Sequence, residues 1–351
     1  MRGFAFLGKG KAGWVDKEEP KLDNFGAILV PKTLSICTTD IHIVYGEMPN
    51  RKKGIILGHE GVGEVVKVGK EVKDFSPGDT VLVPAITPDW RSVDIQRGCF
   101  QHTNGMMSGW KFSNSKDGMM GEYFHVNDAD SNMAMIPKGV ETFQATMLSD
   151  IGSTGIYGAE LAEIQPGDVT AIIGTGPVGL MAIEGAKLRG AGEIIAVGEA
   201  GFRNGMASRY GATYTIDFKD QNVIAEIMEI TENQGVDNVI VTSGENSILN
   251  EAIAIVKTCG IVANINNFSH GEYLTIPRLY WGTGVSNKTI KGGMVPGGRN
   301  RMERLLKLVK CGRLNTTSLV THKYKGLDSI EEAFNAMRDK PEGFLKPIIN
   351  L

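Results

Sequence analysis

The sequence contains no long hydrophobic run and no targeting segment. No stretch of its 351 residues reaches the roughly 18 uninterrupted apolar positions that a membrane-spanning helix needs. The N-terminal residues turn polar too soon to provide the apolar core of a signal peptide. We therefore expect a cytoplasmic protein with no membrane partner.

Cysteine is scarce and scattered. The four cysteines are Cys37, Cys99, Cys259 and Cys311, and no two of them form a C-x-x-C pair. So few thiols do not make a disulfide scaffold, and a chain of this length can build a hydrophobic core without one. The sequence predicts reduced thiols.

Neither sign of charge dominates. The 37 Lys and Arg residues face 40 Asp and Glu residues, which leaves a net charge of −3, and no basic run stands out. A nucleic-acid partner needs concentrated positive charge, so we expect none. Small neutral or anionic ligands remain possible.

The composition is that of an ordinary globular protein. Hydrophobic residues make up 42% and charged residues 22%, far from the range of disordered chains. Because one hydrophobic core usually serves roughly 100–200 residues, the length predicts two domains.

Short strands dominate the first 150 residues. β-branched runs bounded by Gly and Pro predict strands at 26–31, 61–69 and 79–84. This region is therefore expected to be a β-rich domain.

After about residue 155, strands alternate with helices. We expect strands at 169–173, 193–197, 212–216, 236–241 and 260–264, and helices from Val178 onward and at 204–210, 222–231 and 247–257. Alternating units of this kind call for a parallel sheet covered on both faces. Two further helices, at 302–310 and 330–338, precede a strand at 347–349.

A glycine-rich turn follows the strand at 169–173. Gly174, Gly176 and Gly179 fit the G-x-G-x-x-G pattern, with Pro177 and Val178 opening the next helix. Such a turn lets the backbone and the helix N-terminus approach a dinucleotide pyrophosphate. An acidic residue 20 positions after the last glycine, Glu199, strengthens the prediction.

A second constellation has the composition of a zinc site. Cys37 and His42 lie upstream of Gly58-His59-Glu60. A thiolate, an imidazole and a carboxylate are ligands that tetrahedral zinc prefers. Each residue alone is more often a packed or hydrogen-bonded side chain, so the prediction rests on their combination.

These residues resemble the zinc-containing medium-chain alcohol dehydrogenases. The resemblance lies in Gly58-His59-Glu60 with Gly63 and Gly69, in residues 37–42 and in the turn at 174–179. Further blocks at 83–90, 109–114, 124–130 and 288–293 resemble the tetrameric secondary alcohol dehydrogenases of anaerobic bacteria and protists. The likeness spans essentially the whole chain.

The resemblance implies an α/β architecture with two domains. A partly open, β-barrel-like (GroES-like) catalytic domain is expected from residues 1–153, completed by 295–351. Residues 154–294 are expected to form a Rossmann domain with a doubly wound parallel sheet. By the same resemblance the chain is expected to be a homotetramer.

The resemblance also implies one catalytic zinc per chain. In the family this ion is held by a Cys, a His and an Asp with an adjacent Glu, which fall here on Cys37, His59, Asp150 and Glu60. The loop at 88–112 holds only Cys99, so the second, structural zinc of many relatives is expected to be absent.

Catalytic and substrate residues carry over in the same way. Thr39 is expected to take the alcohol proton, which then passes through the cofactor ribose to His42 and to solvent. Ala85 and Trp110 are expected to line a small substrate pocket beside the metal. This sequence departs from the family pattern near that pocket, which leaves chain-length and stereochemical preference open; the departures are Asn267, Thr283, Val285, Met294 and Val295.

For the cofactor, resemblance and local chemistry disagree. The secondary alcohol dehydrogenases usually take NADP, using a small residue followed by Ser and Arg, and later a Tyr. Here Gly198 is followed by Glu199 and Ala200, and Phe218 replaces the Tyr. A carboxylate repels a phosphate but accepts hydrogen bonds from ribose hydroxyls, so the sequence favours NAD. Arg203 or Lys219 reaching a phosphate would favour NADP instead.

The sequence thus predicts a zinc- and nicotinamide-dependent oxidoreductase that interconverts small secondary alcohols and ketones. One alternative is a zinc-free quinone or enone reductase of the same fold, although that enzyme would not need Cys37, His59 and Asp150 together. Another is a dinucleotide-binding protein without catalytic activity. Zinc content and turnover of 2-propanol separate the three.

Overall fold

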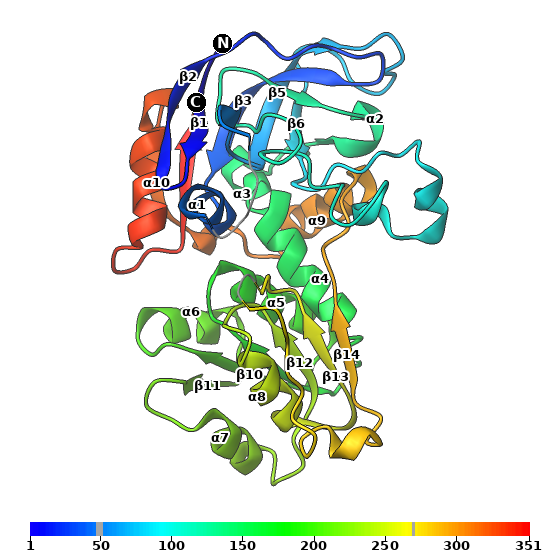
Figure 1. The fold of residues 1–351 in the computed structure, drawn as a ribbon, viewed down its shortest axis with the longest axis vertical. Coiled ribbons are helices and arrows are strands. Elements are labelled where there is room, and N and C mark those ends of the chain that lie inside the picture. Colours follow the sequence, from blue (N-terminus) through cyan, green and yellow to red (C-terminus); the bar gives the residue numbers. More distant parts are fainter. Residues whose placement is uncertain (47–51, 269–270) are drawn as a thin grey trace. The chain divides into compact units, whose positions relative to one another are not determined.

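The computed structural model describes residues 1–46, 52–268 and 271–351. The chain divides into two compact units, drawn in Figure 1. Unit 1 comprises Met1–Ser153 and Pro296–Leu351, and unit 2 comprises Thr154–Val295.

Two sheets build unit 1. A seven-stranded sheet has the order β15-β16-β3-β5-β6-β8, with β7 paired to β3, and a smaller sheet has the order β2-β1-β4. Their strands are β1 Arg2–Gly8, β2 Lys11–Asp16, β3 Ala27–Ser35, β4 Ile55–Ile56, β5 Glu60–Val68, β6 Thr80–Val83, β7 Phe124–Val126, β8 Ala134–Met135, β15 Val320–Lys325 and β16 Lys346–Asn350. The long antiparallel pair β3–β5 shifts register twice, once at Pro31/Thr33, where proline has no N–H for the ladder.

Helices cover this β-structure. They are α1 Thr38–Tyr45, α2 Ala129–Asn132, α3 Thr142–Thr146, α9 Arg299–Lys310 and α10 Ile330–Asp339, and a π-turn, η3, spans Leu148–Gly152. Helix α10 buries Ile330, Ala333, Phe334 and Met337, which recur at helical spacing along one face. The two helices predicted near the C-terminus are confirmed.

Unit 2 is a parallel sheet with alternating helices. The strand order is β11-β10-β9-β12-β13-β14, and every pairing is parallel. The elements are α4 Ser153–Leu161, β9 Val169–Ile173, α5 Pro177–Arg189, β10 Glu193–Gly198, α6 Phe202–Tyr210, β11 Tyr214–Asp217, α7 Val223–Ile230, β12 Val236–Val241, α8 Ile248–Ile255, β13 Val256–Asn264 and β14 Thr289–Gly292. The Rossmann-type fold class is confirmed, and its core consists of buried Val, Ile, Leu and Ala side chains from these strands, α7 and α8.

The predicted boundary between the helix at 247–257 and the following strand is wrong. The helix expected over 247–257 ends at Ile255, and strand β13 starts at Val256 rather than at 260. The apolar run passes directly from helix to strand with no Gly or Pro to mark the change, so periodicity could not find it. Extended backbone at Val256, with φ −76° and ψ 135°, ends the helix.

Two further observations bear on the setting of the protein. In the described ranges, no helix has the length and apolar character to cross a membrane. All four cysteines are free thiols, as predicted.

Candidate metal centre and cofactor site

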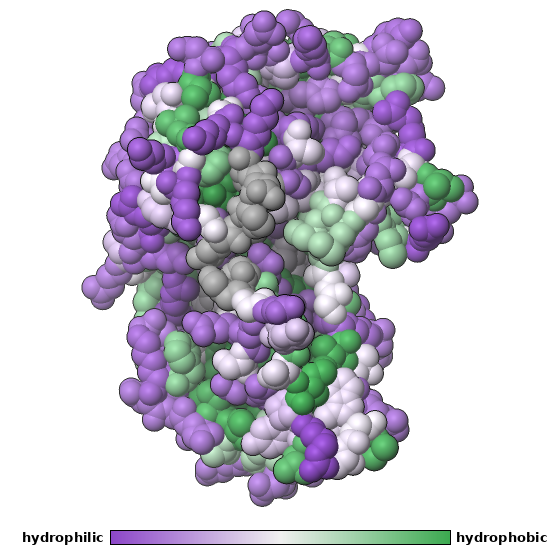
Figure 2. Space-filling view, viewed as in Figure 1, coloured by the Kyte–Doolittle hydropathy of each residue, from purple (hydrophilic) through white to green (hydrophobic). Residues whose placement is uncertain are grey.

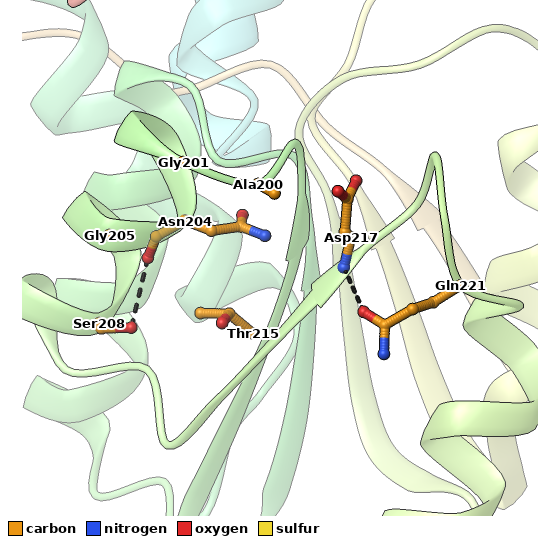
Figure 3. Close-up of a pocket in the computed structure, with 8 residues that line it drawn as sticks. All are labelled: Ala200, Gly201, Asn204, Gly205, Ser208, Thr215, Asp217 and Gln221. Carbon is orange, nitrogen blue, oxygen red and sulfur yellow. Dashed lines mark hydrogen bonds between the residues drawn. The ribbon is translucent and has the colours of Figure 1, made fainter.

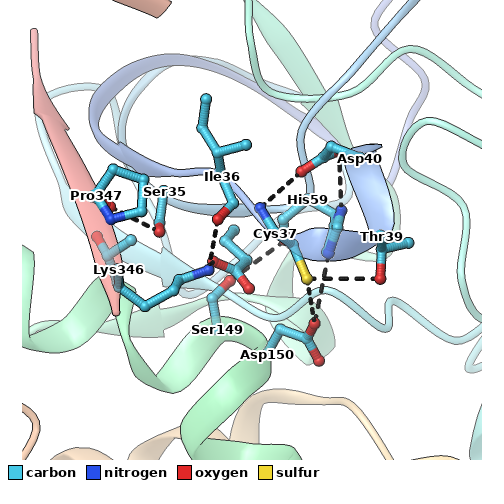
Figure 4. Close-up of polar contacts among 12 residues, drawn as sticks. Ser35, Ile36, Cys37, Thr39, Asp40, His59, Ser149, Asp150, Lys346 and Pro347 are labelled. Carbon is cyan, nitrogen blue, oxygen red and sulfur yellow. Dashed lines mark hydrogen bonds and ion pairs between the residues drawn. The ribbon is translucent and has the colours of Figure 1, made fainter. Parts of the chain in front are cut away.

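Four potential metal ligands converge in unit 1. One donor atom each from Cys37, His59, Glu60 and Asp150 lies within 4.8 Å of all the others. Cys37 immediately precedes α1, His59 and Glu60 stand at the start of β5, and Asp150 lies in the π-turn (Figure 4). Residues far apart in the sequence therefore meet at the ends of separate elements.

Asp40 fixes the orientation of two of these ligands. Its carboxylate accepts hydrogen bonds from the backbone N–H of Cys37 at 2.9 Å and of Gly58 at 3.1 Å. It also lies 3.5 Å from Nδ1 of His59, whose Nε2 faces Asp150 Oδ2 at 3.4 Å. Asp40 is fully buried, so this carboxylate holds the imidazole with Nε2 turned toward the cluster.

The electrostatics of His59 reflect these carboxylates. Burial lowers its pKa, but Asp40 and hydrogen bonds with Asp150, Asp40 and Cys37 outweigh burial and raise the pKa well above its ordinary value. A positive charge is thus stabilised at this position, as expected where anionic groups surround a cation site.

Glu60 forms a buried ion pair with Lys346. Its Oε2 accepts a hydrogen bond from Lys346 Nζ at 2.6 Å, and the same ammonium donates to the carbonyl of Ile36 at 2.7 Å. Both side chains are only 1% exposed, and the charge of Glu60 holds the pKa of Lys346 above its ordinary value despite burial. Glu60 Oε1, in contrast, is buried without a hydrogen-bond partner among the described residues.

The π-turn η3 places Asp150. Its i→i+5 hydrogen bond runs from Gly152 N to Met147 O at 2.8 Å. Ser149 Oγ bonds the carbonyl of Val83 and accepts from Gly61 N at 3.3 Å, which fastens the turn to β5 and β6. π-turns inside helical segments are frequent at functional sites.

The predicted substrate residues lie beside this cluster. Ala85 is buried and its N–H donates to Ser149 O at 2.9 Å, one residue before Asp150. The Trp110 ring meets the His59 ring edge to face, with centroids 6.3 Å apart. Two apolar surfaces therefore border the cluster.

Thr39 and His42 both lie on α1. Thr39 Oγ1 is 3.5 Å from Cys37 Sγ, so its hydroxyl faces the cluster. His42 follows one turn later on the same helix and is half-buried. Their assigned roles in proton transfer stay predictions.

The donor set fits zinc. A thiolate, an imidazole nitrogen and a carboxylate are characteristic of catalytic zinc sites, which keep one position open. Glu60 supplies a further carboxylate to the same group, and its Oε1 has no hydrogen-bond partner among the described residues. Among the described residues this is the single group of three or more His, Cys, Asp and Glu side chains placed to hold a metal.

The glycine turn in unit 2 has the predicted form. Gly174 follows β9 with φ +108°, a conformation that favours glycine, and α5 starts at Pro177 after its N-cap Gly176. A Cβ at Gly179 would lie 1.8 Å from the carbonyl oxygen of Gly174, so no other residue fits there. The turn leads directly into the N-terminus of α5, and a helix N-terminus favours an anion.

The end of β10 carries both polar and charged groups. A Cβ on Gly198 would meet Asn204 Oδ1 at 2.6 Å and would overlap Thr175 Oγ1, so these polar atoms occupy the space beside this glycine. Glu199 Oε1 lies 2.5 Å from Lys219 Nζ. Phe218 is 54% exposed, with its N–H donating to Gly198 O at 3.2 Å.

A shallow pocket of about 350 Å³ adjoins this end of the sheet. Figure 3 shows Ala200 and the Asp217 carboxylate at its rim and Asn204 reaching in from α6. The pocket belongs to unit 2, whereas the metal cluster belongs to unit 1. Its position matches the adenosine end of the expected cofactor site, not the reacting end.

Several contributing residues escaped the sequence analysis. Asp40, Ser149 and Lys346 organise the metal cluster, and Thr175 and Asn204 line Gly198. Only Asp40, placed three residues after Cys37 at a helix start, carried a sequence signal, because that spacing suits a carboxylate that caps the first turn. The others act through contacts distant in sequence.

Comparison with known proteins defines the class. Residues 26–138 match the model of the alcohol dehydrogenase GroES-like domain, and residues 177–310 match that of the zinc-binding dehydrogenase. These matches, together with full-length relatives that are about half identical in sequence, show that the chain belongs to the zinc-dependent medium-chain alcohol dehydrogenases.

The chain is 53% identical to the NADP-dependent isopropanol dehydrogenase of Thermoanaerobacter brockii, over 100% of both chains. It is 51% identical to the protein of the same name from Clostridium beijerinckii, again over 100% of both chains. The GroES-like and Rossmann fold assignment and the family recognised in the sequence are thereby confirmed.

Solved structures agree. The apo form of zinc-dependent alcohol dehydrogenase 2 from Streptococcus pneumoniae superposes with a TM-score of 0.91 at 30% identity, covering 100% of this chain and 98% of that one. The alcohol dehydrogenase TADH from Thermus sp. ATN1 gives 0.87 at 27% identity, with 100% and 99% covered.

Proposed function

We propose that this protein interconverts small secondary alcohols and ketones by hydride transfer to or from a nicotinamide cofactor at a zinc site. The observation that carries the proposal is the convergence of Cys37, His59, Glu60 and Asp150 in one cluster bordered by Ala85 and Trp110. The relatives named isopropanol dehydrogenase support the substrate class.

Cys37, His59 and Asp150 would hold the zinc, with Glu60 as an adjacent carboxylate. When bound, zinc supplies Lewis-acid chemistry that lowers the pKa of an alcohol and polarises a carbonyl. Asp40 keeps His59 in the orientation needed for binding, and Lys346 balances the charge of Glu60 in a buried setting. The protein therefore supplies a preformed ligand set.

Thr39 and His42 would handle the proton. The Thr39 hydroxyl stands beside the cluster and accepts the proton that leaves the alcohol as its own passes on. His42, a turn further along α1, delivers a proton to solvent because imidazole titrates near neutral pH. The hydride goes to the cofactor and the hydroxyl proton goes to solvent, so the alcohol loses two electrons and two protons in all.

The substrate pocket would favour secondary alcohols. The methyl of Ala85 leaves room for a second substituent on the carbinol carbon, and the Trp110 ring supplies an apolar wall beside His59. We expect higher specificity constants for 2-butanol than for 1-butanol, measured side by side with zinc content. A clear preference for 1-butanol would overturn the assignment.

The rival functions differ in their use of the cluster. A zinc-free quinone or enone reductase has no need for a thiol, an imidazole and a carboxylate whose donor atoms lie within 4.8 Å of one another. A protein that only binds dinucleotide has no need for them either. Purified protein that holds one zinc per chain and oxidises 2-propanol excludes both. Full activity without zinc would favour the reductase, and cofactor binding without any turnover would favour the binding protein.

We further propose NAD as the preferred cofactor, although the named relatives are NADP-dependent. Glu199 supports this preference because its carboxylate can accept hydrogen bonds from ribose hydroxyls and repels a phosphate. Exposed Phe218 offers no hydroxyl in place of the Tyr expected from the resemblance. Specificity constants for both cofactors test the preference.

A homotetramer remains part of the proposal. Strand β14 is the edge of the unit 2 sheet, and an edge strand presents unpaired backbone groups to a second copy. Hydrophobic side chains between β13 and β14 are exposed, including Tyr273, Leu279 and Val285 at 74%, 72% and 80%; Figure 2 shows hydrophobic groups on this part of unit 2. Sedimentation of the purified protein tests the oligomer, and cell fractionation tests the predicted cytoplasmic location.

A further inference from the structure

The Glu199–Lys219 pair changes the charge that a cofactor would meet at the end of β10. Glu199 alone would repel a 2′-phosphate, but its carboxylate lies 2.5 Å from the Lys219 ammonium. This pair raises the pKa of Lys219, so the lysine remains charged at any working pH. Both side chains are about half exposed, at 51% and 55%, and are free to change partners.

A second cation lies beside the phosphate-binding turn. A Cβ built on Gly176 would be 3.4 Å from Nη1 of Arg203, so the guanidinium projects from the first turn of α6 toward the glycine turn. Arg203 is half-buried, and it has no hydrogen-bond or ion-pair partner within the ranges that the structure describes. A half-buried guanidinium without a counter-ion suits an anionic ligand.

Polar groups line the space beside Gly198. Asn204 is 7% exposed, and its Oδ1 is buried with no hydrogen-bond partner among the described residues. This oxygen and the Thr175 hydroxyl both stand where a side chain of residue 198 would begin. They can bond the hydroxyls of a ribose placed against Gly198, and Thr175 can also donate to a phosphate.

The acidic groups nearby are accounted for. Asp217 Oδ1 accepts a hydrogen bond from the backbone N–H of Lys219 at 3.0 Å, which fixes the start of the loop after β11. Three carboxylates, Glu199, Asp217 and Asp220, thus lie near two cations, Arg203 and Lys219. The two cations offset most of the negative charge at this end of the sheet.

We propose that Arg203 and Lys219 together form a 2′-phosphate site, so that this chain accepts NADP as well as NAD, Lys219 leaving Glu199 for the phosphate when NADP binds. The proposal rests on the proposed nicotinamide-dependent function and deepens it. Arg203 and Lys219 occupy positions other than those of the Ser, Arg and Tyr expected from the resemblance. Glu199 then accepts hydrogen bonds from the ribose hydroxyls of NAD, and it pairs with Lys219 until NADP binds.

Binding of nucleotides that differ only in the 2′-phosphate tests this directly. Adenosine 2′,5′-bisphosphate and AMP are titrated by calorimetry into wild type, Lys219→Met, Arg203→Met and Glu199→Gln. Each loss of a cation should weaken the bisphosphate about 10-fold or more, as expected for a hydrogen bond to a charged group, while AMP affinity changes less than about 2-fold. Glu199→Gln should tighten the bisphosphate.

Matched controls lie in the same unit. Lys257→Met removes another ion-paired lysine, which pairs with Asp237 at the amino ends of β12 and β13. Arg209→Met removes an arginine from the last turn of α6. Neither should change binding of either nucleotide. Steady-state specificity constants for NAD and NADP should move in parallel with the binding data.

Two results would overturn the inference. An equal loss of AMP and bisphosphate in Arg203→Met would assign this residue to the 5′-phosphate common to both ligands. Unchanged bisphosphate binding in Lys219→Met would show that Glu199 never releases its partner. Wild type that binds neither nucleotide would instead contradict the proposed nicotinamide dependence itself, which keeps the two failures distinct.

Discussion

The metal cluster of unit 1 and the cofactor end of unit 2 differ first in burial. His59 and Glu60 are 2% and 1% exposed, whereas the side chains of Glu199 and Lys219 are 51% and 55% exposed. Within the cluster, Glu60 on β5 pairs with Lys346 on β16. At the cofactor end there are an exposed ion pair, Glu199–Lys219, and a half-buried arginine, Arg203, without a partner in the part of the chain that the structure describes.

This difference explains where the sequence keeps its family pattern and where it departs. Removing one member of a buried ion pair leaves an uncompensated charge, which lowers the free energy of unfolding by about 3–5 kcal/mol. An exposed pair contributes about 0–1 kcal/mol, so its members can be replaced without loss of the fold. Cofactor choice can therefore change while the metal site stays constant.

Breaking the cluster should give the largest effect. Cys37→Ser should remove most of the zinc and lower 2-propanol turnover by more than about 10³-fold, since the metal supplies several kcal/mol of transition-state stabilisation. Metal analysis and kinetics of the same preparation check this, with exposed Cys99→Ser as the control. Two zinc ions per chain in wild type, or full activity without zinc, would contradict it.

Removing the proton path should lower turnover while the metal stays bound. Thr39→Val and His42→Ala each act on the proton and not on the ligand set, so turnover should fall about 10²–10⁴-fold with zinc content unchanged. Thr38→Val, one residue earlier on α1, is the matched control. A Thr39→Val enzyme with wild-type rates at every pH would remove Thr39 from the mechanism.

Asp40→Asn tests whether a buried carboxylate that is not itself a metal ligand contributes to zinc affinity. The amide keeps the shape of the carboxylate but not its charge, so His59 loses its anionic partner and zinc affinity should fall about 10–100-fold. Competition with a chelator measures the affinity, and Asp328→Asn, whose carboxylate is 81% exposed, is the control. An unchanged zinc affinity would reduce Asp40 to a backbone contact.

Exchanging charges at the exposed end should have a smaller effect, confined to cofactor choice. Glu199→Ser with Ala200→Arg removes a carboxylate and adds a cation. The ratio of the specificity constant for NADP to that for NAD should rise about 10-fold or more, because one hydrogen bond to a charged group contributes about this much. Zinc content should not change. Native enzyme that already favours NADP 10-fold or more would show that Glu199 does not control the site.

The metal cluster and the cofactor end also differ in how much of each could be predicted from the sequence. Cys37, His59 and Glu60 could be predicted because metal ligands must be of particular residue types. The turn at 174–179 could be predicted because only glycine fits at position 179, where a Cβ would lie 1.8 Å from the carbonyl oxygen of Gly174. Lys346 and Ser149 could not be found, because their roles exist only after strands distant in sequence have paired. The Glu199–Lys219 pair depends on a loop conformation that no periodicity encodes.

Lys116, a half-buried lysine without an acidic hydrogen-bond partner, contrasts with Lys346. Lys116 Nζ donates to His125 O at 2.8 Å and to Asn127 Oδ1 at 3.2 Å, and lies 4.3 Å from the centroid of the Phe112 ring. Burial, with a smaller contribution from Lys111, lowers the pKa of Lys116 to about 7, whereas the pKa of buried Lys346 is raised by Glu60.

The sign of the pH dependence follows from this shift. Between pH of about 7 and the ordinary lysine pKa of about 10.4, the unfolded chain binds the Lys116 proton and the folded chain does not, so this residue makes stability rise with pH, by at most about 1.4 kcal/mol per pH unit. Urea unfolding midpoints from pH 7 to pH 9 should therefore rise more steeply for wild type than for Lys116→Met. Lys67→Met removes an exposed lysine paired with Glu19 and should follow wild type. Parallel curves for wild type and Lys116→Met would mean that Lys116 keeps its proton, and that neutral hydrogen-bond partners stabilise a buried ammonium as well as Glu60 does.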